Sequence, residues 1–208
     1  MITQGNTRVL CTASIAPDVP KWLIDKETGT ASRGWVTAEY AMLPGSTNDR
    51  KRRGPDSRGT EIQRLIGRAL RACVDLEKMP GLMITCDCDV LLADGGTRTA
   101  SITGAFVALA KTIQHARQSG LIKHNPIEGP VAAVSVGIVG GKTFLDLDYV
   151  LDQGADVDMN VAMNHRGQFV EVQGTGEHGT FSHEELHRML NLAGKGIRQL
   201  MKIQRRSL

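Results

Sequence analysis

A layered α+β fold is predicted by the order of secondary-structure signals along the chain. Strand-like segments alternate irregularly with helix-like segments, the second half contains two consecutive antiparallel hairpin signals, and an amphipathic helix closes the sequence. A doubly wound parallel sheet would require a regular alternation of strands and helices, which this sequence lacks. The mixed order therefore favours a mixed or antiparallel sheet packed with helices.

Length and composition predict one globular domain. The chain has 208 residues, of which 41% are hydrophobic and 23% charged, so it can bury a sizeable core. Because no internal repeat, low-complexity tract or flexible linker divides the chain, we expect a single domain over residues 1–208.

The first half of the chain contains three predicted strands and two predicted helices. Strand patterns occur at residues 7–13, 34–41 and 82–91. The polar residues 25–33 are typical of a long hairpin loop between the first two strands. A helix with one apolar face and outlying arginines is expected over residues 60–76, and a second helix over residues 101–114.

The second half predicts two hairpins followed by a helix. Strand patterns occur at residues 131–139, 142–149, 158–163 and 168–172. Gly140 and Gly141 form a strong turn signal between the first pair, and residues 164–167 form the turn of the second pair. A long helix is expected over residues 183–204.

The sequence also bears on the compartment. No apolar run approaches the roughly 20 residues that a membrane-spanning helix needs, and the first residues do not have the pattern of a signal peptide. We therefore expect a soluble, cytoplasmic protein with no membrane partner. The four cysteines are too few for a disulfide framework, and no second pair completes a zinc site with Cys86 and Cys88.

A glycine-rich turn at residues 93–100 suggests phosphate binding. It joins a predicted strand to a predicted helix, where free backbone N–H groups and the helix dipole favour an anion. Gly95 and Gly96 let the backbone approach a ligand closely, and Arg98 can bind two phosphate oxygens. In the alternative interpretation, Thr97 or Thr99 caps the helix and the glycines only form the turn.

A basic loop precedes the first predicted helix. The net charge of +3 does not by itself indicate a nucleic-acid binder, but residues 50–53 are all Arg or Lys and lie among turn-forming residues. Arg58 ends this loop. Such a loop suits a phosphate backbone, because neutralising phosphates releases counterions without base-specific geometry. A solvated charge run or a targeting signal remains the alternative.

Five aspartates gather between residues 146 and 158, next to apolar strands. Carboxylates at a strand end suit Mg²⁺, which prefers a few carboxylate oxygens together with water and substrate phosphates. The spacing does not match an EF-hand loop. The alternative is a solvated strand edge with acidic turn residues.

Residues 183–187 match the H-E-x-x-H pattern of zinc hydrolases. Two observations weigh against a zinc site. Ser182 and Glu185 form a capping-box pattern, which places His183 at the first helical position. Residues 189–208 contain no Asp, Glu or His that could supply a third ligand.

Several segments together resemble the bacterial ribonuclease PH family, over essentially the whole chain. The resemblance is carried by residues 6–14, 61–71, 94–104, 132–138 and 158–161. It implies the ribosomal protein S5 domain 2-like fold and a homohexameric ring built as a trimer of dimers. The implied activity is phosphorolytic 3′→5′ trimming of tRNA precursors and other RNA 3′ ends, including rRNA. Inorganic phosphate would be the co-substrate, nucleoside diphosphates the products, and nucleotide addition the reverse reaction.

The resemblance also implies roles for individual residues. Arg58, Gly96, Thr97 and Arg98 match the positions that hold the phosphate. No side-chain nucleophile is required, because phosphate itself attacks the RNA.

Two further pairs complete the implied site. Asp152 and Asp158 match the aspartates associated with catalysis and with the metal, which is expected to be Mg²⁺. Arg50 and Arg53 are the nearest counterparts of the arginines that contact RNA.

The chain departs from the family pattern in several places. It lacks the usual N-terminal segment, so it is expected to be a fragment or a shortened relative. Gly45, Leu92 and Leu151 stand where polar or charged residues are usual. A non-catalytic RNA-binding subunit of a similar ring is the alternative function, but retention of the phosphate-binding and aspartate positions favours an enzyme.

Overall fold

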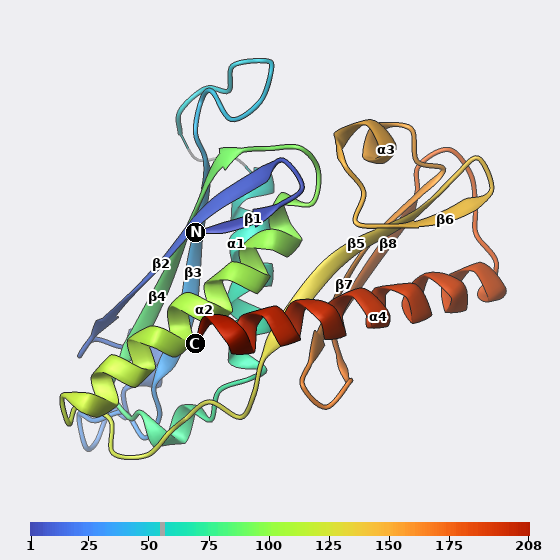
Figure 1. Ribbon diagram of the computed structural model, residues 1–208. Coiled ribbons are helices and arrows are strands. Elements are labelled where there is room, and N and C mark those ends of the chain that lie inside the picture. Colours follow the sequence, from blue (N-terminus) through green and yellow to red (C-terminus); the bar gives the residue numbers. More distant parts are fainter. Residues whose placement is uncertain (55–56) are drawn as a thin grey trace.

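The computed structural model describes residues 1–54 and 57–208 and confirms the α+β fold. Two four-stranded sheets pack with helices, in the orders β1-β2-β4-β3 and β6-β5-β7-β8 (Figure 1). The strands are β1 (Ile2–Gln4), β2 (Thr7–Ala16), β3 (Trp35–Met42), β4 (Met83–Leu92), β5 (Val131–Val139), β6 (Lys142–Leu145), β7 (Val157–Asn164) and β8 (Phe169–Gly176). The helices are α1 (Ser57–Arg71), α2 (Thr97–Gln118), α3 (Tyr149–Gln153) and α4 (His183–Ser207), with short 3-10 turns at η1 (Lys21–Leu23) and η2 (Leu76–Lys78).

The first sheet contradicts one prediction. Residues 25–33 do not close a hairpin between β2 and β3, because β4 lies between these strands, antiparallel to β2 and parallel to β3. The alternating residues of β4 explain its central place, since Ile84, Cys86, Cys88 and Val90 are all buried. Turn signals between two strands could not show that a third strand, far along the chain, separates them.

Helix boundaries differ from the predicted ones at the ends of α1 and α2. Helix α1 ends at Arg71, earlier than expected, and the chain then bends so that Val74 forms a β-bridge with Ile127. Helix α2 begins at Thr97 and runs to Gln118. It packs against β2 of the first sheet and β5 of the second, so α2 is the element shared by both halves (Figure 1).

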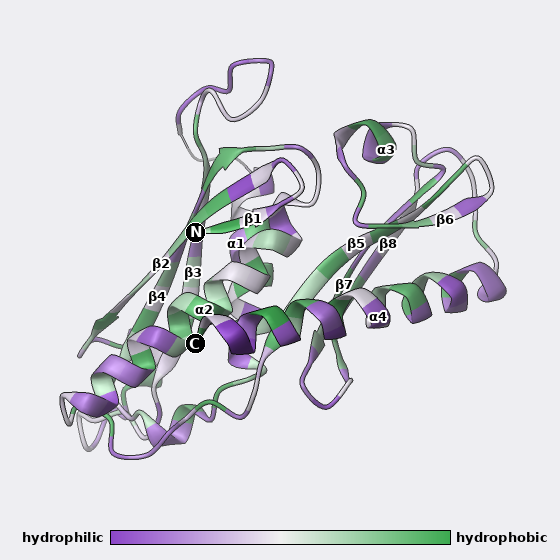
Figure 2. Cartoon of the chain, in the orientation of Figure 1, coloured by the Kyte–Doolittle hydropathy of each residue, from purple (hydrophilic) through white to green (hydrophobic). Residues whose placement is uncertain are grey.

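The second sheet confirms both predicted hairpins. Strand β5 pairs antiparallel with β6 and β7, and β7 pairs antiparallel with β8. Strand β5 is buried almost throughout because both α2 and α4 pack on it, and much of it is coloured hydrophobic in Figure 2. Gln204 of α4 donates hydrogen bonds to the carbonyls of Thr103 and Val131, which ties the C-terminal helix to both halves.

Residues 142–149 form a shorter strand than predicted. Strand β6 ends at Leu145, and α3 follows over Tyr149–Gln153, with Asp148 as its N-cap. No helix in the described part of the chain is long and apolar enough to cross a membrane.

Candidate active site

A cavity of about 510 Å³ lies where the two sheets and the first turn of α2 meet. It brings together residues from α1, α2, α3 and β7, which are far apart in the sequence. Seven of the residues singled out in the sequence line it: Arg58, Gly95, Gly96, Thr97, Arg98, Asp152 and Asp158. The cavity therefore places two guanidinium groups and an N-terminal helix turn opposite two carboxylates.

The turn before α2 has the backbone that the phosphate hypothesis requires. Gly95 and Gly96 have φ of 75° and 56°, in the left-handed region that favours glycine. Gly96 is the N-cap of α2, and no side chain of the described residues caps this helix end. The interpretation of Thr97 or Thr99 as caps is therefore wrong. The first N–H groups of α2 stay available to an anion in the cavity.

Gly95 is also packed too closely to accept a side chain. A Cβ there would lie 2.3 Å from the carbonyl oxygen of Leu147. We expect Gly95→Ala to lower the free energy of unfolding by about 2–4 kcal/mol, because it adds a backbone clash to the strain of positive φ. Gly140→Ala is the matched control, since Gly140 also has positive φ (55°) but open space around it. Chemical denaturation checks both; equal losses would show that no clash operates at Gly95.

Thr97 is held by a residue that the sequence did not reveal as part of the site. The Tyr40 hydroxyl and Thr97 Oγ1 are 2.9 Å apart. Burial raises the pKa of Tyr40, so its hydroxyl stays protonated at neutral pH. The alternation of β3 could have placed Tyr40 on the buried face, but not beside a residue 57 positions away.

The two arginines reach the cavity differently. Arg58 is exposed near the start of α1. Arg98 is mostly buried, with 16% of its side chain exposed. Its Nη1 donates to Gln173 Oε1 at 2.6 Å and lies 3.6 Å from Glu61 Oε1. Such a guanidinium can bind an anion bidentately in a fixed orientation.

Asp152 and Asp158 have the properties of a divalent-cation site. Burial raises the pKa of both carboxyls, and the charge of Asp152 helps to raise the pKa of Asp158 to about 6. Within the described residues, Asp158 Oδ1 is buried without a hydrogen-bond partner, while its Oδ2 accepts from Asn160 Nδ2 at 3.3 Å. Two crowded carboxylates with an unpaired oxygen fit Mg²⁺, whose remaining positions water and phosphate oxygens can fill.

The other three aspartates of the acidic segment have structural roles. Asp148 caps α3 by accepting from Leu151 N at 2.9 Å, and Asp156 accepts from Gly140 N at the same distance. Asp146 accepts from the Gln4 side chain at 2.7 Å. The segment therefore does not act as one cluster, and only two of its five carboxylates line the cavity.

The basic loop reaches the site through a residue that the sequence did not single out. Lys51 lines the cavity. Arg53 lines an adjacent groove beside β3, which Lys51 also borders, whereas Arg50 lines neither of these hollows. The charge run itself was the available signal, but it could not show which of its members points inward.

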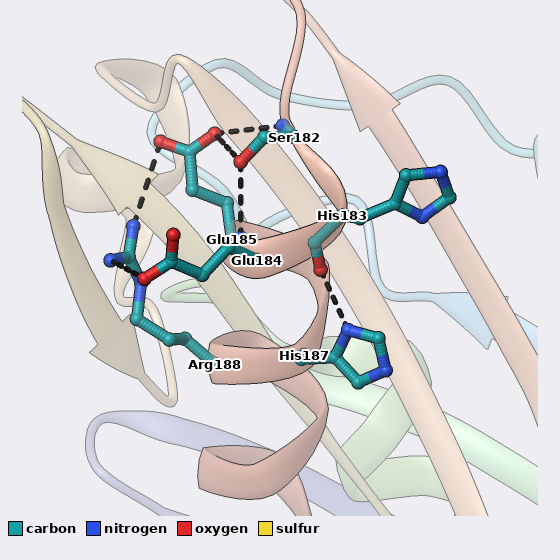
Figure 3. Close-up of polar contacts among 6 residues, drawn as sticks. All are labelled: Ser182, His183, Glu184, Glu185, His187 and Arg188. Carbon is teal, nitrogen blue, oxygen red and sulfur yellow. Dashed lines mark hydrogen bonds and ion pairs between the residues drawn. The ribbon is translucent and has the colours of Figure 1, made fainter.

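The H-E-x-x-H pattern begins a helix, as Figure 3 shows. Ser182 and Glu185 form a complete capping box. His187 Nδ1 lies 2.8 Å from the His183 carbonyl oxygen, and the His183 ring points away from His187 (Figure 3). Within residues 1–54 and 57–208, no group of three or more His, Cys, Asp or Glu side chains could hold a metal ion. The motif is therefore explained by helix capping.

The cavity combines the cationic side chains, helix N-terminus and carboxylates that an enzyme acting on phosphate groups requires. Residues 1–113 match the model of the 3′ exoribonuclease family, domain 1, and residues 129–196 match domain 2 of the same family. Ribonuclease PH of Corynebacterium efficiens and that of Corynebacterium glutamicum are each 51% identical to this chain, over 100% of it and 85% of the relative. The chain belongs to the ribonuclease PH family of phosphorolytic 3′→5′ exoribonucleases.

Solved structures support the fold independently. The Archaeoglobus fulgidus exosome with RNA bound to the active site has a chain that matches with a TM-score of 0.80 and 21% identity, over 96% of this chain and 80% of that one. An archaeal exosome core matches with a TM-score of 0.75 and 20% identity, over 97% and 78%. The resemblance seen in the sequence thus extends to the fold.

Proposed function

We propose that the cavity lined by Arg58, Arg98 and the two aspartates is where this enzyme carries out phosphorolysis. The observation that carries the proposal is that an anion-binding helix turn and a carboxylate pair line one cavity. Inorganic phosphate is the co-substrate, and the RNA 3′ end is the substrate.

The chemistry transfers a nucleotide to phosphate. A phosphate oxygen attacks the phosphorus of the last phosphodiester, the bond from this phosphorus to the 3′ oxygen of the preceding nucleotide breaks, and a nucleoside diphosphate is released. The shortened RNA keeps a protonated 3′ hydroxyl. Arg58 and Arg98 offset the repulsion between the two anions, and the Thr97 hydroxyl with the turn N–H groups orients the nucleophile.

Asp152 and Asp158 would hold Mg²⁺, which neutralises charge on the leaving 3′ oxygen when it is bound. The unpaired Asp158 Oδ1 and the raised pKa of both carboxyls support this assignment, because a bound cation relieves their mutual repulsion.

We extend the proposal to substrate and assembly. The enzyme trims tRNA precursor and other RNA 3′ ends in the cytoplasm, and its similarity to the ribonuclease PH relatives supports the RNA-trimming activity. The likeness to exosome chains supports a ring, here a homohexamer built as a trimer of dimers. Residues 1–208 act as one functional domain, because both halves of the chain contribute to the cavity.

The deciding assay uses a 3′-tailed tRNA with Mg²⁺, with and without inorganic phosphate. Nucleoside diphosphates should appear, and only when phosphate is present. Release of monophosphates, or equal trimming without phosphate, would overturn the proposal. Intact RNA binding without any turnover would support a non-catalytic subunit instead.

RNA binding by the basic loop is tested by the double variant Arg50→Ala/Arg53→Ala. We expect its RNA dissociation constant to rise by about 3–10-fold at 0.1 M salt, and the slope of log K against log salt to fall by about 1 per arginine that contacts phosphate. Arg117→Ala is the control, because Arg117 lies at the end of α2 far from the cavity. An unchanged salt slope in the double variant would refute the role of these arginines.

A further inference from the structure

We propose that Glu61 and Gln173 are positioning residues that hold the Arg98 guanidinium in its phosphate-binding orientation. The inference rests on the proposed function, in which Arg98 binds the attacking phosphate. It adds two residues that do not line the cavity.

The three side chains form a closed polar network. Arg98 Nη1 donates to Gln173 Oε1 at 2.6 Å, and Gln173 Nε2 donates to Glu61 Oε1 at 3.1 Å. Glu61 Oε1 also lies 3.6 Å from Arg98 Nη1. In the described part of the chain, all these contacts of Arg98 use Nη1, so the remaining N–H groups of its guanidinium are left for an anion.

The side chains of Glu61 and Gln173 contact Arg98 from outside the active-site cavity. Arg98 lines the active-site cavity, whereas Glu61 and Gln173 do not line it and instead line a second hollow between α1 and β8. Glu61 belongs to α1, Arg98 to α2 and Gln173 to β8. The network therefore joins three elements from both halves of the chain, and it contacts Arg98 through residues that lie outside the active-site cavity.

Charge alone does not explain why Glu61 lies there. Its carboxylate, 3.6 Å from Arg98 Nη1, weakens the attraction of the site for phosphate. If Glu61 acted only through its field, removing its charge would tighten phosphate binding. If it acts through geometry, removing its hydrogen bonds loosens Arg98 and weakens phosphate binding. The two explanations therefore predict opposite changes in phosphate affinity when Glu61 is replaced.

Glu61→Ala, Glu61→Gln and Gln173→Leu separate these explanations. The alanine and leucine variants break the network, and each should raise the KM for phosphate by about tenfold with a smaller effect on RNA binding. Glu61→Gln keeps an oxygen that accepts from Gln173, and its phosphate KM should stay within about threefold of the parent.

The control uses a second bridge between the same two elements. Arg68 of α1 pairs with Glu171 of β8. Among residues 1–54 and 57–208, the polar contacts of Arg98 are with Gln173 and Glu61 and not with this pair. Glu171→Gln therefore perturbs the contact between α1 and β8 without touching the network, and it should leave the phosphate KM unchanged.

The experiment measures the phosphate KM, kcat and RNA dissociation constant, with phosphate binding followed by calorimetry and folding by thermal melting. A lower phosphate KM in both Glu61 variants would overturn the proposal in favour of a field effect. Equal increases in the Glu171 and Glu61 variants would overturn it in favour of a general loss of packing. If Glu61→Ala does not fold, Gln173→Leu and Glu61→Gln still show whether the KM for phosphate rises or falls when the network is changed. Absence of phosphate-dependent turnover in the parent enzyme would instead refute the proposed function.

Discussion

Arg98→Ala will abolish phosphorolysis while leaving RNA binding nearly intact. Arg98 lies at the first turn of α2, is mostly buried, and is held in one orientation by Gln173 and Glu61. In the proposed function, it supplies a preorganised charge for the phosphate that attacks the RNA backbone. Removing such a charge-assisted contact should lower kcat/KM for phosphate by about 1000-fold, which corresponds to about 4 kcal/mol.

Arg98→Lys refines this prediction. Lysine keeps the charge but cannot form two parallel hydrogen bonds, so we expect activity between that of the alanine variant and the parent. The measurement is the rate of nucleoside diphosphate release against phosphate concentration, with RNA affinity measured at fixed salt. Arg166→Ala is the control, since Arg166 pairs with Glu128 in the turn between β7 and β8. Unchanged turnover in Arg98→Ala would remove the arginine from the mechanism.

Asp158→Asn will abolish turnover and stabilise the fold at pH 8. Burial and the neighbouring Asp152 raise the pKa of the Asp158 carboxyl from 3.8 to about 6. The folded state therefore favours the protonated form. Stability linked to this group is fully present below pH 4 and is lost as the pH rises through about 6. The asparagine variant avoids that loss, which we expect to be about 1–2 kcal/mol because the site is partly open to solvent.

The stability difference should depend on pH. Without Mg²⁺, the variant should unfold at a higher temperature than the parent at pH 8, and the two should converge near pH 4. Mg²⁺ should stabilise the parent more than the variant, because the carboxylate pair is intact only in the parent. Asp18→Asn, at an exposed loop position, is the control. A variant that is less stable than the parent at pH 8 would contradict the assigned cause of the pKa shift.

Most of the helices and strands could be predicted from the sequence, but the order in which the strands of the first sheet pair could not. The hairpins β5–β6 and β7–β8 follow from turn residues that lie between adjacent strands, so local signals sufficed. The pairing of β2 with β4 joins strands about 70 residues apart, with α1 and β3 in between. No turn between them indicates it, and the expected hairpin of β2 with β3 was wrong for that reason.

Some residues of the candidate site could likewise be recognised from the sequence, whereas others could be found only in the structure. The glycine turn, its arginine and the two aspartates were recognised from residue type and family resemblance, and all line the cavity. Sequence reasoning did not recognise four further residues: Tyr40, Lys51, Glu61 and Gln173. Tyr40, Glu61 and Gln173 belong to the site because they contact residues far along the chain, and Lys51 belongs to it because its side chain lines the cavity. Gln173 and Glu61, for example, are 112 positions apart.

The sequence by itself determined the α+β class, the second-half hairpins, the C-terminal helix and the chemical character of the phosphate turn. These depend on periodicity, turn chemistry and residue type, which act over a few residues. Only the tertiary structure decided the strand order of the first sheet, which two of five clustered aspartates line the cavity, and what holds Arg98. These depend on burial and hydrogen bonds between segments that meet only when α2 packs between the two sheets.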